Sequence, residues 1–334
     1  MSNTRDKFET ESTDYFSTLK DYEFREIVCP LCYRSERTPM FEKGTMRVVR
    51  CVCGMVYNRR QPGVNALDKF YQESDAMKEW AKIKSSDAEK FRQKKKFQPI
   101  AEMLKDKKSF MDIGCGTGTF LYWVKKENPE AEVSGIDSHE GSVAVAKAMG
   151  IDAKWQGILD FFREDERTFD VVSLWGVLEH YPTPKSLLHH CKLALNKDGY
   201  IVVCVPNMDS LVVETLRQHT FTFCPQHLWY FDKSSLERLA WEVGLELTSY
   251  RTIEPEVDPI VRWRLGYDPY DRSVNTSGYS KMAEVEHEAK SRGYKIVACF
   301  KKKKVQALCT NYSESWKQIY PQQKPTDPGP KDDH

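Results

Sequence analysis

Two closely spaced pairs of cysteines near the start of the chain could bind a metal ion. Cys29 and Cys32 form a C-x-x-C pair, and after 18 further residues Cys51 and Cys53 form a C-x-C pair. Four thiolates on two tight turns supply the tetrahedral sulfur set of zinc, and four protein ligands close the site, which favours a structural ion over a catalytic one. We therefore predict a zinc ribbon over residues 26–62; the alternative is a ribbon with free thiols.

A glycine-rich turn could bind a different kind of ligand. The apolar run 109–113 leads into Gly114, Gly116 and Gly118, and a helical pattern follows. Glycines let the backbone turn sharply and let a ligand approach the main chain closely. The spacing is G-x-G-x-G, whereas nicotinamide- and flavin-binding turns have G-x-G-x-x-G, because Thr119 occupies the last position of that motif.

Two acidic residues accompany this turn. Asp112 stands two positions before the first glycine, and Asp137 ends the next expected strand, 19 residues beyond Gly118. A carboxylate at the end of the second strand lies where the hydroxyls of a ribose would be bound. The turn and Asp137 therefore predict a site for a ligand that contains a ribose.

The elements that must position these residues alternate between strand and helix. Such alternation predicts an α/β fold with a doubly wound, Rossmann-like, seven-stranded and mostly parallel sheet that is covered on both faces. The expected strands are 109–113, 132–137, 153–156, 170–175, 200–205, 245–251 and 294–300, and the expected helices are 119–126, 141–149, 185–195 and 232–243.

The composition is that of a globular chain. Of its 334 residues 12% are aromatic, and 50 basic residues against 49 acidic ones leave a net charge of +1, too little to attract nucleic acid or a membrane surface. The N-terminus lacks the apolar run of a signal peptide, and no segment reaches the roughly 18 apolar residues of a membrane span. We therefore expect a cytoplasmic protein, in which cysteines are thiols or metal ligands.

Several segments resemble the class I S-adenosylmethionine (SAM)-dependent methyltransferases, over roughly residues 97–251 and 294–303. Besides the glycine-rich turn, Phe169–Trp175 resembles the family's fourth strand. Val177–His180 resembles the Leu-Glu-His segment of ubiquinone-type and bacterial sugar methyltransferases, and residues 221–231 resemble their P-x-H-x-x-x-F segment. The cysteine pairs are similar to the zinc ribbon of bacterial sugar and surface-polysaccharide methyltransferases, although the second pair of those ribbons is usually C-x-x-C.

The resemblance assigns the residues that bind SAM. The three glycines would cradle the methionine part, Asp112 would order their loop, and Asp137 would bind the ribose. Gly157 and Ile158 would flank the adenine; many relatives have Asp at the position of Ile158, so adenine recognition here would depend on backbone groups and apolar packing. The full predicted set is Asp112, Gly114, Cys115, Gly116, Gly118, Asp137, Ser138, Gly157, Ile158 and Trp175.

Methyl transfer is an in-line displacement, so the protein must align the acceptor and remove its proton. His180 and His227 are the candidate bases, because an imidazole titrates near neutrality. Either could instead be structural, and which one acts stays open. Tyr230 would donate a hydrogen bond to the acceptor or orient it. Arg262 or Arg264 would help to bind an anionic acceptor such as a nucleotide-linked sugar, unless their loop is merely solvated.

The resemblance also divides the chain into parts. Residues 78–108 hold 11 basic and 5 acidic residues, but the apolar residues among them recur at helical spacing, which favours an amphipathic helix over a nucleic-acid patch. We expect an N-terminal arm at 1–25, the ribbon at 26–62, a helical connector at 63–108, the methyltransferase domain at 109–305 with an insertion at 253–293, and a partly disordered tail at 306–334.

These features predict methyl transfer from SAM to a small molecule, with a hydroxyl of a sugar or surface-polysaccharide precursor as the expected acceptor and carbon or nitrogen acceptors open. The alternative is an rRNA or tRNA methyltransferase that uses the ribbon for RNA recognition, which would need a basic face. The net charge argues against it, as does Leu174–Val177 in place of an Asn/Asp-Pro-Pro-Tyr/Phe tetrapeptide. A binding module without activity would need a broken cofactor site, whereas Asp112, the glycines and Asp137 are all present.

Overall fold

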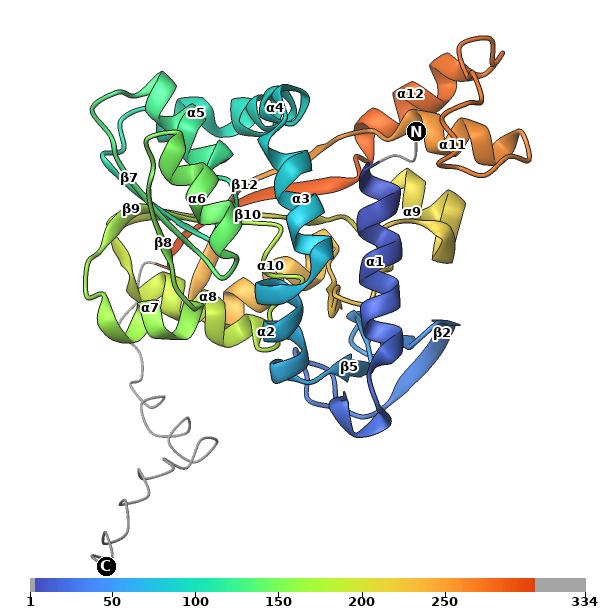
Figure 1. Cartoon of the computed structure of the whole chain (residues 1–334), viewed down its shortest axis with the longest axis horizontal. Helices are drawn as coiled ribbons and strands as arrows, with labels where there is room; N and C mark the ends of the chain where they lie inside the picture. Colours follow the sequence, from blue (N-terminus) through green and yellow to red (C-terminus); the bar gives the residue numbers. More distant parts are fainter. Residues whose placement is uncertain (1–3, 304–334) are drawn as a thin grey trace, which may run out of the picture. The chain divides into compact units, whose positions relative to one another are not determined.

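The computed structural model describes residues 4–303 (Figure 1). The tail for which we predict partial disorder, residues 306–334, lies outside the described residues. None of the helices in the described part of the chain is long and apolar enough to cross a membrane.

A seven-stranded sheet forms the centre of the fold and confirms the predicted α/β class. Its strand order is β12-β13-β10-β9-β6-β7-β8. The five strands from β10 to β8 are parallel, and β13 runs antiparallel to both of its neighbours. The strands are β6 (Ser109–Ile113), β7 (Glu132–Asp137), β8 (Asp152–Trp155), β9 (Phe169–Trp175), β10 (Leu195–Pro206), β12 (Leu245–Ile253) and β13 (Lys295–Lys302).

Alternate residues of the central strands point to opposite faces of the sheet, and each face has its own apolar cluster. In β6, Met111 and Ile113 join one cluster while Phe110 joins the other. The first cluster packs on α7 (Ile158–Glu164), α8 (Pro184–Leu193) and α10 (Lys233–Glu242). The second packs on α4 (Asp87–Leu104), α5 (Thr119–Glu127) and α6 (Glu140–Ala148). This double cover buries the strands and leaves their carboxyl ends to form a site.

The ribbon folds as a small sheet of order β11-β4-β3-β2, in which one strand comes from far along the chain. Strand β11 (Trp229–Tyr230) pairs antiparallel with β4 (Val56–Asn58), so the second half of the chain completes the ribbon. A separate two-stranded sheet joins the ribbon's ends. The other strands of this region are β1 (Phe24–Glu26), β2 (Arg37–Lys43), β3 (Met46–Cys51) and β5 (Arg60–Pro62).

The N-terminal arm contains a helix that the sequence pattern does not reveal. Helix α1 (Thr4–Thr18) lies along α3 (Asp75–Ser85), as Figure 1 shows, and its last turn reaches α2 (Val64–Glu73). Phe16 is fully buried there, with its ring 4.9 Å from the ring of Phe70. The arm is therefore part of the main apolar cluster.

The predicted insertion at 253–293 is folded rather than an open loop. It forms α11 (Val257–Arg264) and α12 (Met282–Ser291). Three short helices lie elsewhere in the chain: η1 (Asp21–Glu23), α9 (Leu211–Leu216) and η2 (Arg217–His219). Ile260, Val261 and Val285 pack with Leu211 of α9 in a cluster of their own. The insertion thus has a small core that is separate from the sheet.

Replacing Phe16 by Ala tests whether α1 contributes to the stability of the folded chain. We expect the free energy of unfolding to fall by about 3–5 kcal/mol, because the change removes a buried aromatic ring. Urea denaturation followed by circular dichroism measures it. The matched control is Phe91→Ala, which truncates a ring that is 58% exposed and should change stability by at most about 0.5 kcal/mol. Equal effects of the two changes would show that α1 is not packed.

Candidate functional site

The three glycines of the turn between β6 and α5 have positive φ angles and differ in what surrounds them. A Cβ atom on Gly114 would lie 2.6 Å from a methyl group of Val177, and one on Gly118 would lie 2.9 Å from Cβ of Ala146. Gly116, at φ +52°, has nothing within 4 Å of that position. Packing therefore requires two of the glycines, while Gly116 faces open space that a ligand could fill.

The two acidic residues hold this turn in different ways. Asp137 accepts hydrogen bonds from the backbone N–H groups of Gly116 and His139, each at 2.8 Å. Asp112 is buried and accepts a 2.6 Å bond from the Ser173 hydroxyl, so it joins β6 to β9 and does not bond the loop that it was predicted to order. Asp137 makes that loop bond. Burial raises the pKa of Asp112 to about 8 and also raises the pKa of Asp137.

The remaining predicted cofactor residues lie at the carboxyl ends of neighbouring strands. Trp175 ends β9, and its ring lies 4.9 Å from that of Phe120. Its indole N–H is buried with no hydrogen-bond partner among the described residues. The carbonyl of Ser138 accepts a 2.9 Å bond from the Trp155 indole. Cys115 is buried within the turn, and Gly157 and Ile158 begin α7.

These surroundings fit a nucleoside-containing cofactor such as SAM. The open side of Gly116 leaves room beside the main chain, and each Asp137 oxygen keeps a lone pair for a hydroxyl. A buried indole N–H without an acceptor is uncommon in a native protein and is satisfied when a ligand supplies one. Four adjacent strand ends therefore converge on one cofactor site.

The two predicted base residues come together beyond the end of β9. The ring centroids of His180 and His227 lie 4.6 Å apart, and the two imidazoles and the carboxylate of Glu179 each offer a ligand atom within 4.8 Å of the others. The Glu179 carbonyl accepts backbone hydrogen bonds from Leu228 and Trp229, which hold the two segments together.

Burial controls the charge of this group. It lowers the pKa of His180 well below its ordinary value and lowers that of His227 to about 4, while it raises the pKa of Glu179 to about 7. Both imidazoles are consequently neutral at physiological pH. Each also bonds a backbone carbonyl through Nδ1: His180 bonds Gln226 at 3.0 Å, and His227 bonds Thr222 at 2.6 Å.

Tyrosine at this site comes from a different element than predicted. The hydroxyl of Tyr71, on α2, lies 2.9 Å from Nδ1 of His180. Tyr230, the predicted tyrosine, is buried with Met46 and Phe223, and its hydroxyl lies 4.0 Å from the sulfur of Met46. The sequence places Tyr71 on a helix but carries no pattern that links this helix to residue 180. The contact depends on the packing of α2 and could not be found from spacing.

The two predicted arginines lie in the folded insertion. Arg262 donates to the backbone carbonyls of Val274 at 3.2 Å and Pro269 at 3.4 Å, so it holds its own loop. Arg264 is exposed on the same helix. The structure does not bring either of them into the group around the histidines.

The four predicted zinc ligands form one cluster. Sγ of Cys29 lies 3.5 Å from Sγ of Cys53, Sγ of Cys32 lies 3.3 Å from Sγ of Cys51, and all four sulfur atoms lie within 4.8 Å of one another. A tetrahedral ion with zinc–sulfur bonds of about 2.3 Å separates its sulfur ligands by about 3.8 Å. The cluster therefore fits zinc, and the shorter C-x-C spacing still brings Cys51 into it.

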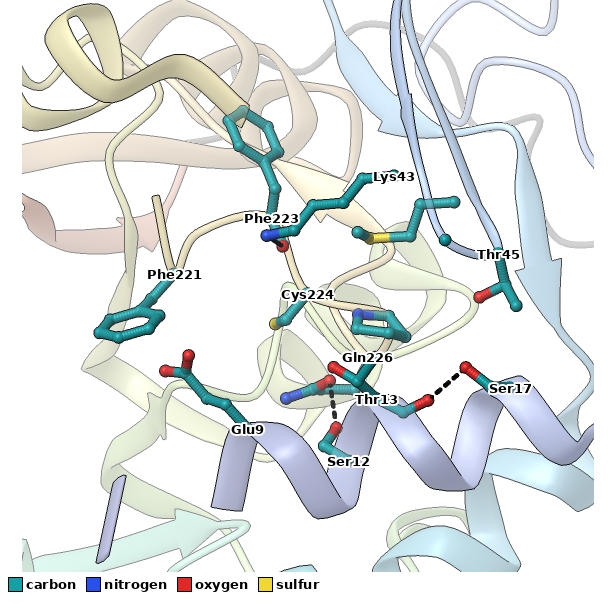
Figure 2. A pocket seen from close by; sticks show the side chains of 13 residues that line it. Glu9, Ser12, Thr13, Ser17, Lys43, Thr45, Phe221, Phe223, Cys224 and Gln226 are labelled. Carbon is teal, nitrogen blue, oxygen red and sulfur yellow. Dashed lines mark hydrogen bonds between the residues drawn. The ribbon is translucent and has the colours of Figure 1, made fainter. Parts of the chain in front are cut away.

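Figure 2 shows a pocket beside the segment 221–231, where α1 and the β2–β3 hairpin meet it. Ser12 of α1 donates to the Gln226 side chain at 2.8 Å, and Lys43 of the hairpin donates to the Phe223 carbonyl at 3.0 Å. Two N-terminal elements thus support the segment that carries His227.

Comparison with known proteins identifies the domain that holds this site. Residues 88–250 match the family described as Methyltransferase domain. Residues 88–250 of the chain therefore form a methyltransferase domain. The chain is 28% identical over 154 residues to a ubiquinone biosynthesis O-methyltransferase of Alkalilimnicola ehrlichii, a match that covers 42% of this chain and 62% of the relative. A protein of the same name from Bordetella bronchiseptica is 26% identical over 183 residues, which cover 51% of this chain and 72% of that one.

The methyltransferase domain also has solved structural neighbours. The plantazolicin methyltransferase BamL, in complex with a triazolic desmethylPZN analog and SAH, superposes with a TM-score of 0.50 at 13% identity, over 71% of this chain and 94% of that chain. This likeness shows the fold. The match to the first curated relative spans less than two thirds of that relative's length.

Replacing Gly116 by Ala tests the open side of the turn. We expect SAM and SAH to bind at least about tenfold more weakly, because the new methyl group enters the space left for the ligand. Isothermal titration calorimetry measures the affinity. Gly150→Ala is the matched control, since Gly150 also has a positive φ and nothing within 4 Å but lies at the end of α6. If both variants bind alike, the cofactor is not held at this turn.

Proposed function

We propose that the protein transfers the methyl group of SAM to a hydroxyl oxygen of a small-molecule acceptor. The observation that carries the proposal is the placement of these groups after adjacent parallel strands. Asp137 bonds Gly116 of the glycine-rich turn, and the segment that leads from β9 to His180 packs on this turn through Val177. The two relatives described above are named as O-methyltransferases, which supports oxygen as the methylated atom.

SAM supplies an activated methyl group on a sulfonium, so the protein's own residues need only hold the two reactants in line and manage one proton. Asp137 and the backbone of the turn would hold the cofactor. In the displacement the methyl carbon loses its bond to sulfur and gains one to the acceptor oxygen, and the hydroxyl proton leaves. Trp175 would close the cofactor side of the cleft, and its N–H would meet a polar cofactor atom.

The histidine pair would take the acceptor proton. Donation from Nδ1 to the carbonyls of Gln226 and Thr222 fixes the tautomer and leaves Nε2 of each ring as a proton acceptor. The Tyr71 hydroxyl oxygen would accept from the same Nδ1–H of His180 and help to position the ring. Which imidazole is the base stays a prediction to be tested, as does the sugar or surface-polysaccharide acceptor. The names of the relatives point instead to ubiquinone biosynthesis.

Labelled methyl transfer identifies the acceptor class. The full chain is incubated with methyl-labelled SAM and three sets of acceptors: nucleotide-linked sugars, dihydroxylated phenols of the kind found in quinone precursors, and total tRNA and rRNA. We expect label on a hydroxyl oxygen of a small molecule, assigned by mass spectrometry and NMR. Label on RNA would instead establish the alternative function. No SAH formed with any acceptor, despite SAM binding, would reject the proposal.

The cysteine cluster would hold a structural zinc ion that fixes the ribbon sheet. Because β4 of the ribbon pairs with β11, which directly follows His227 and Leu228, we propose that zinc supports the acceptor side of the site. The cofactor side is built from β6 to β9, and none of these strands pairs with a strand of the ribbon.

Loss of the ribbon ion should therefore affect the two substrates differently. For Cys29→Ser we expect a zinc content lowered by one ion per chain and a KM for the acceptor raised by about tenfold or more, with SAH affinity changed less than about threefold. Mass spectrometry of the metal content and steady-state kinetics measure both. Cys191→Ala removes a buried thiol of α8 and serves as control. An unchanged metal content in Cys29→Ser would contradict the zinc assignment.

A further inference from the structure

We propose that Glu179, His180 and His227 bind a divalent transition-metal ion, at a second metal site distinct from the cysteine cluster. The inference rests on the proposed methyl transfer to a hydroxyl oxygen, because the ion would hold that oxygen. With both imidazoles bound to the ion, water would take the acceptor proton in place of a histidine. Its first support is distance: one ligand atom from each of the three side chains lies within 4.8 Å of the other two. Backbone bonds from Leu228 and Trp229 to the Glu179 carbonyl keep these ligands together although they come from two distant segments.

The orientation of the two imidazoles is the second support. A histidine that binds a metal through one nitrogen commonly donates its other N–H to a carbonyl or carboxylate, which fixes the ring and its tautomer. Both rings have this arrangement, since Nδ1 of His180 bonds the Gln226 carbonyl and Nδ1 of His227 bonds the Thr222 carbonyl. In His180 the Tyr71 hydroxyl oxygen, 2.9 Å from the same Nδ1, shares that N–H. The Nε2 lone pairs have no hydrogen-bond donor among the described residues and are left for a ligand.

The carboxylate is the third support. Glu179 is only 1% exposed, and its Oε2 is buried without a hydrogen-bond partner in the described part of the chain. A buried carboxylate oxygen of this kind is costly unless a cation or a donor satisfies it. Lys295, on β13, attracts this carboxylate electrostatically, but no hydrogen bond or ion pair joins the two among the described residues. A metal ion between Glu179 and the imidazoles would satisfy the oxygen directly.

The donor set indicates which ions bind. Two imidazole nitrogens and one carboxylate oxygen suit Zn²⁺, Mn²⁺ or Fe²⁺, whereas Mg²⁺ and Ca²⁺ prefer oxygen ligands alone and soft ions prefer sulfur. Three protein ligands leave coordination positions open, unlike the closed set of four cysteines. An acceptor hydroxyl that entered an open position would lose its proton to water more readily, because the ion lowers the pKa of a bound oxygen. The acceptor oxygen would then attack the methyl group as an alkoxide or phenolate.

Cobalt binding to the full-length chain separates the two metal sites. Four thiolates give Co²⁺ intense sulfur-to-metal charge-transfer bands, whereas two imidazoles and a carboxylate give only weak visible bands. After chelation of the chain and titration with Co²⁺, we expect both signatures in the wild-type protein. In Glu179→Gln and His227→Gln the thiolate signature should remain while the weak bands disappear and one ion less is bound per chain. His189→Gln, which removes an imidazole of α8 outside the group, should retain both signatures.

The wild-type protein supplies a measurement that does not depend on how the variants fold. If its thiolate signature saturates and no further Co²⁺, Zn²⁺ or Mn²⁺ binds, the inference is overturned. The proposed function would still stand if the protein with only its ribbon ion transfers the methyl group. The inference is supported if a second ion binds, if removing it abolishes acceptor methylation, and if adding it back restores methylation. The affinity for SAH should change less than about threefold throughout. An ion bound at the histidine pair without methyl transfer to any acceptor would support the site and reject the function.

Discussion

The carbonyl oxygen of Glu179 accepts two backbone hydrogen bonds, from Leu228 and Trp229, and much of the candidate site depends on them. They hold the segment that carries His227 against the end of β9, where Glu179 and His180 follow the strand. Without this connection the two imidazoles would lie on unrelated loops. With it, the pair is held just after the end of β9, in a segment whose Val177 packs on the glycine-rich turn.

The same segment is held from the other side by the N-terminal third of the chain. Strand β4 pairs with β11, Ser12 bonds Gln226, and Lys43 bonds the Phe223 carbonyl. The ribbon is therefore more than an appended module, since its cysteines and Tyr57 belong to the same apolar cluster as Leu228 and Trp229. A metal ion bound in the ribbon would act on the chemistry through packing, at a distance from the reacting atoms.

The sequence was enough to predict the strands of the sheet, but not all of the helices that pack around it. Buried parallel strands are continuous apolar runs, so β6 and β7 were predicted with the bounds that they have. Helix α1 is mostly polar, and its Phe16 is buried only because α2 and α3 receive it. The apolar residues of the insertion do not recur clearly at helical spacing, so α11 and α12 were not predicted.

The site shows the same division. Residues next to a glycine or at a strand end could be assigned from spacing, because local backbone geometry places them. Tyr71 could not, since its partner His180 is 109 residues away and only tertiary packing joins them. Asp112 and Asp137 were both found, but which of them bonds the loop depends on rotamers and neighbours that no spacing records.

The position of β11, far along the chain from its partner strand β4, has a consequence for how the chain folds. Residues 59–228 separate the two strands that pair in the ribbon, so the edge of β4 stays unpaired during synthesis until β11, inside the methyltransferase domain, has been made. An unpaired edge strand can associate with another chain, and long-range pairing slows folding. A metal ion that closes the cysteine loops early would hold β3 and β4 in register over that interval. Metal supply during translation would then govern the yield of folded protein.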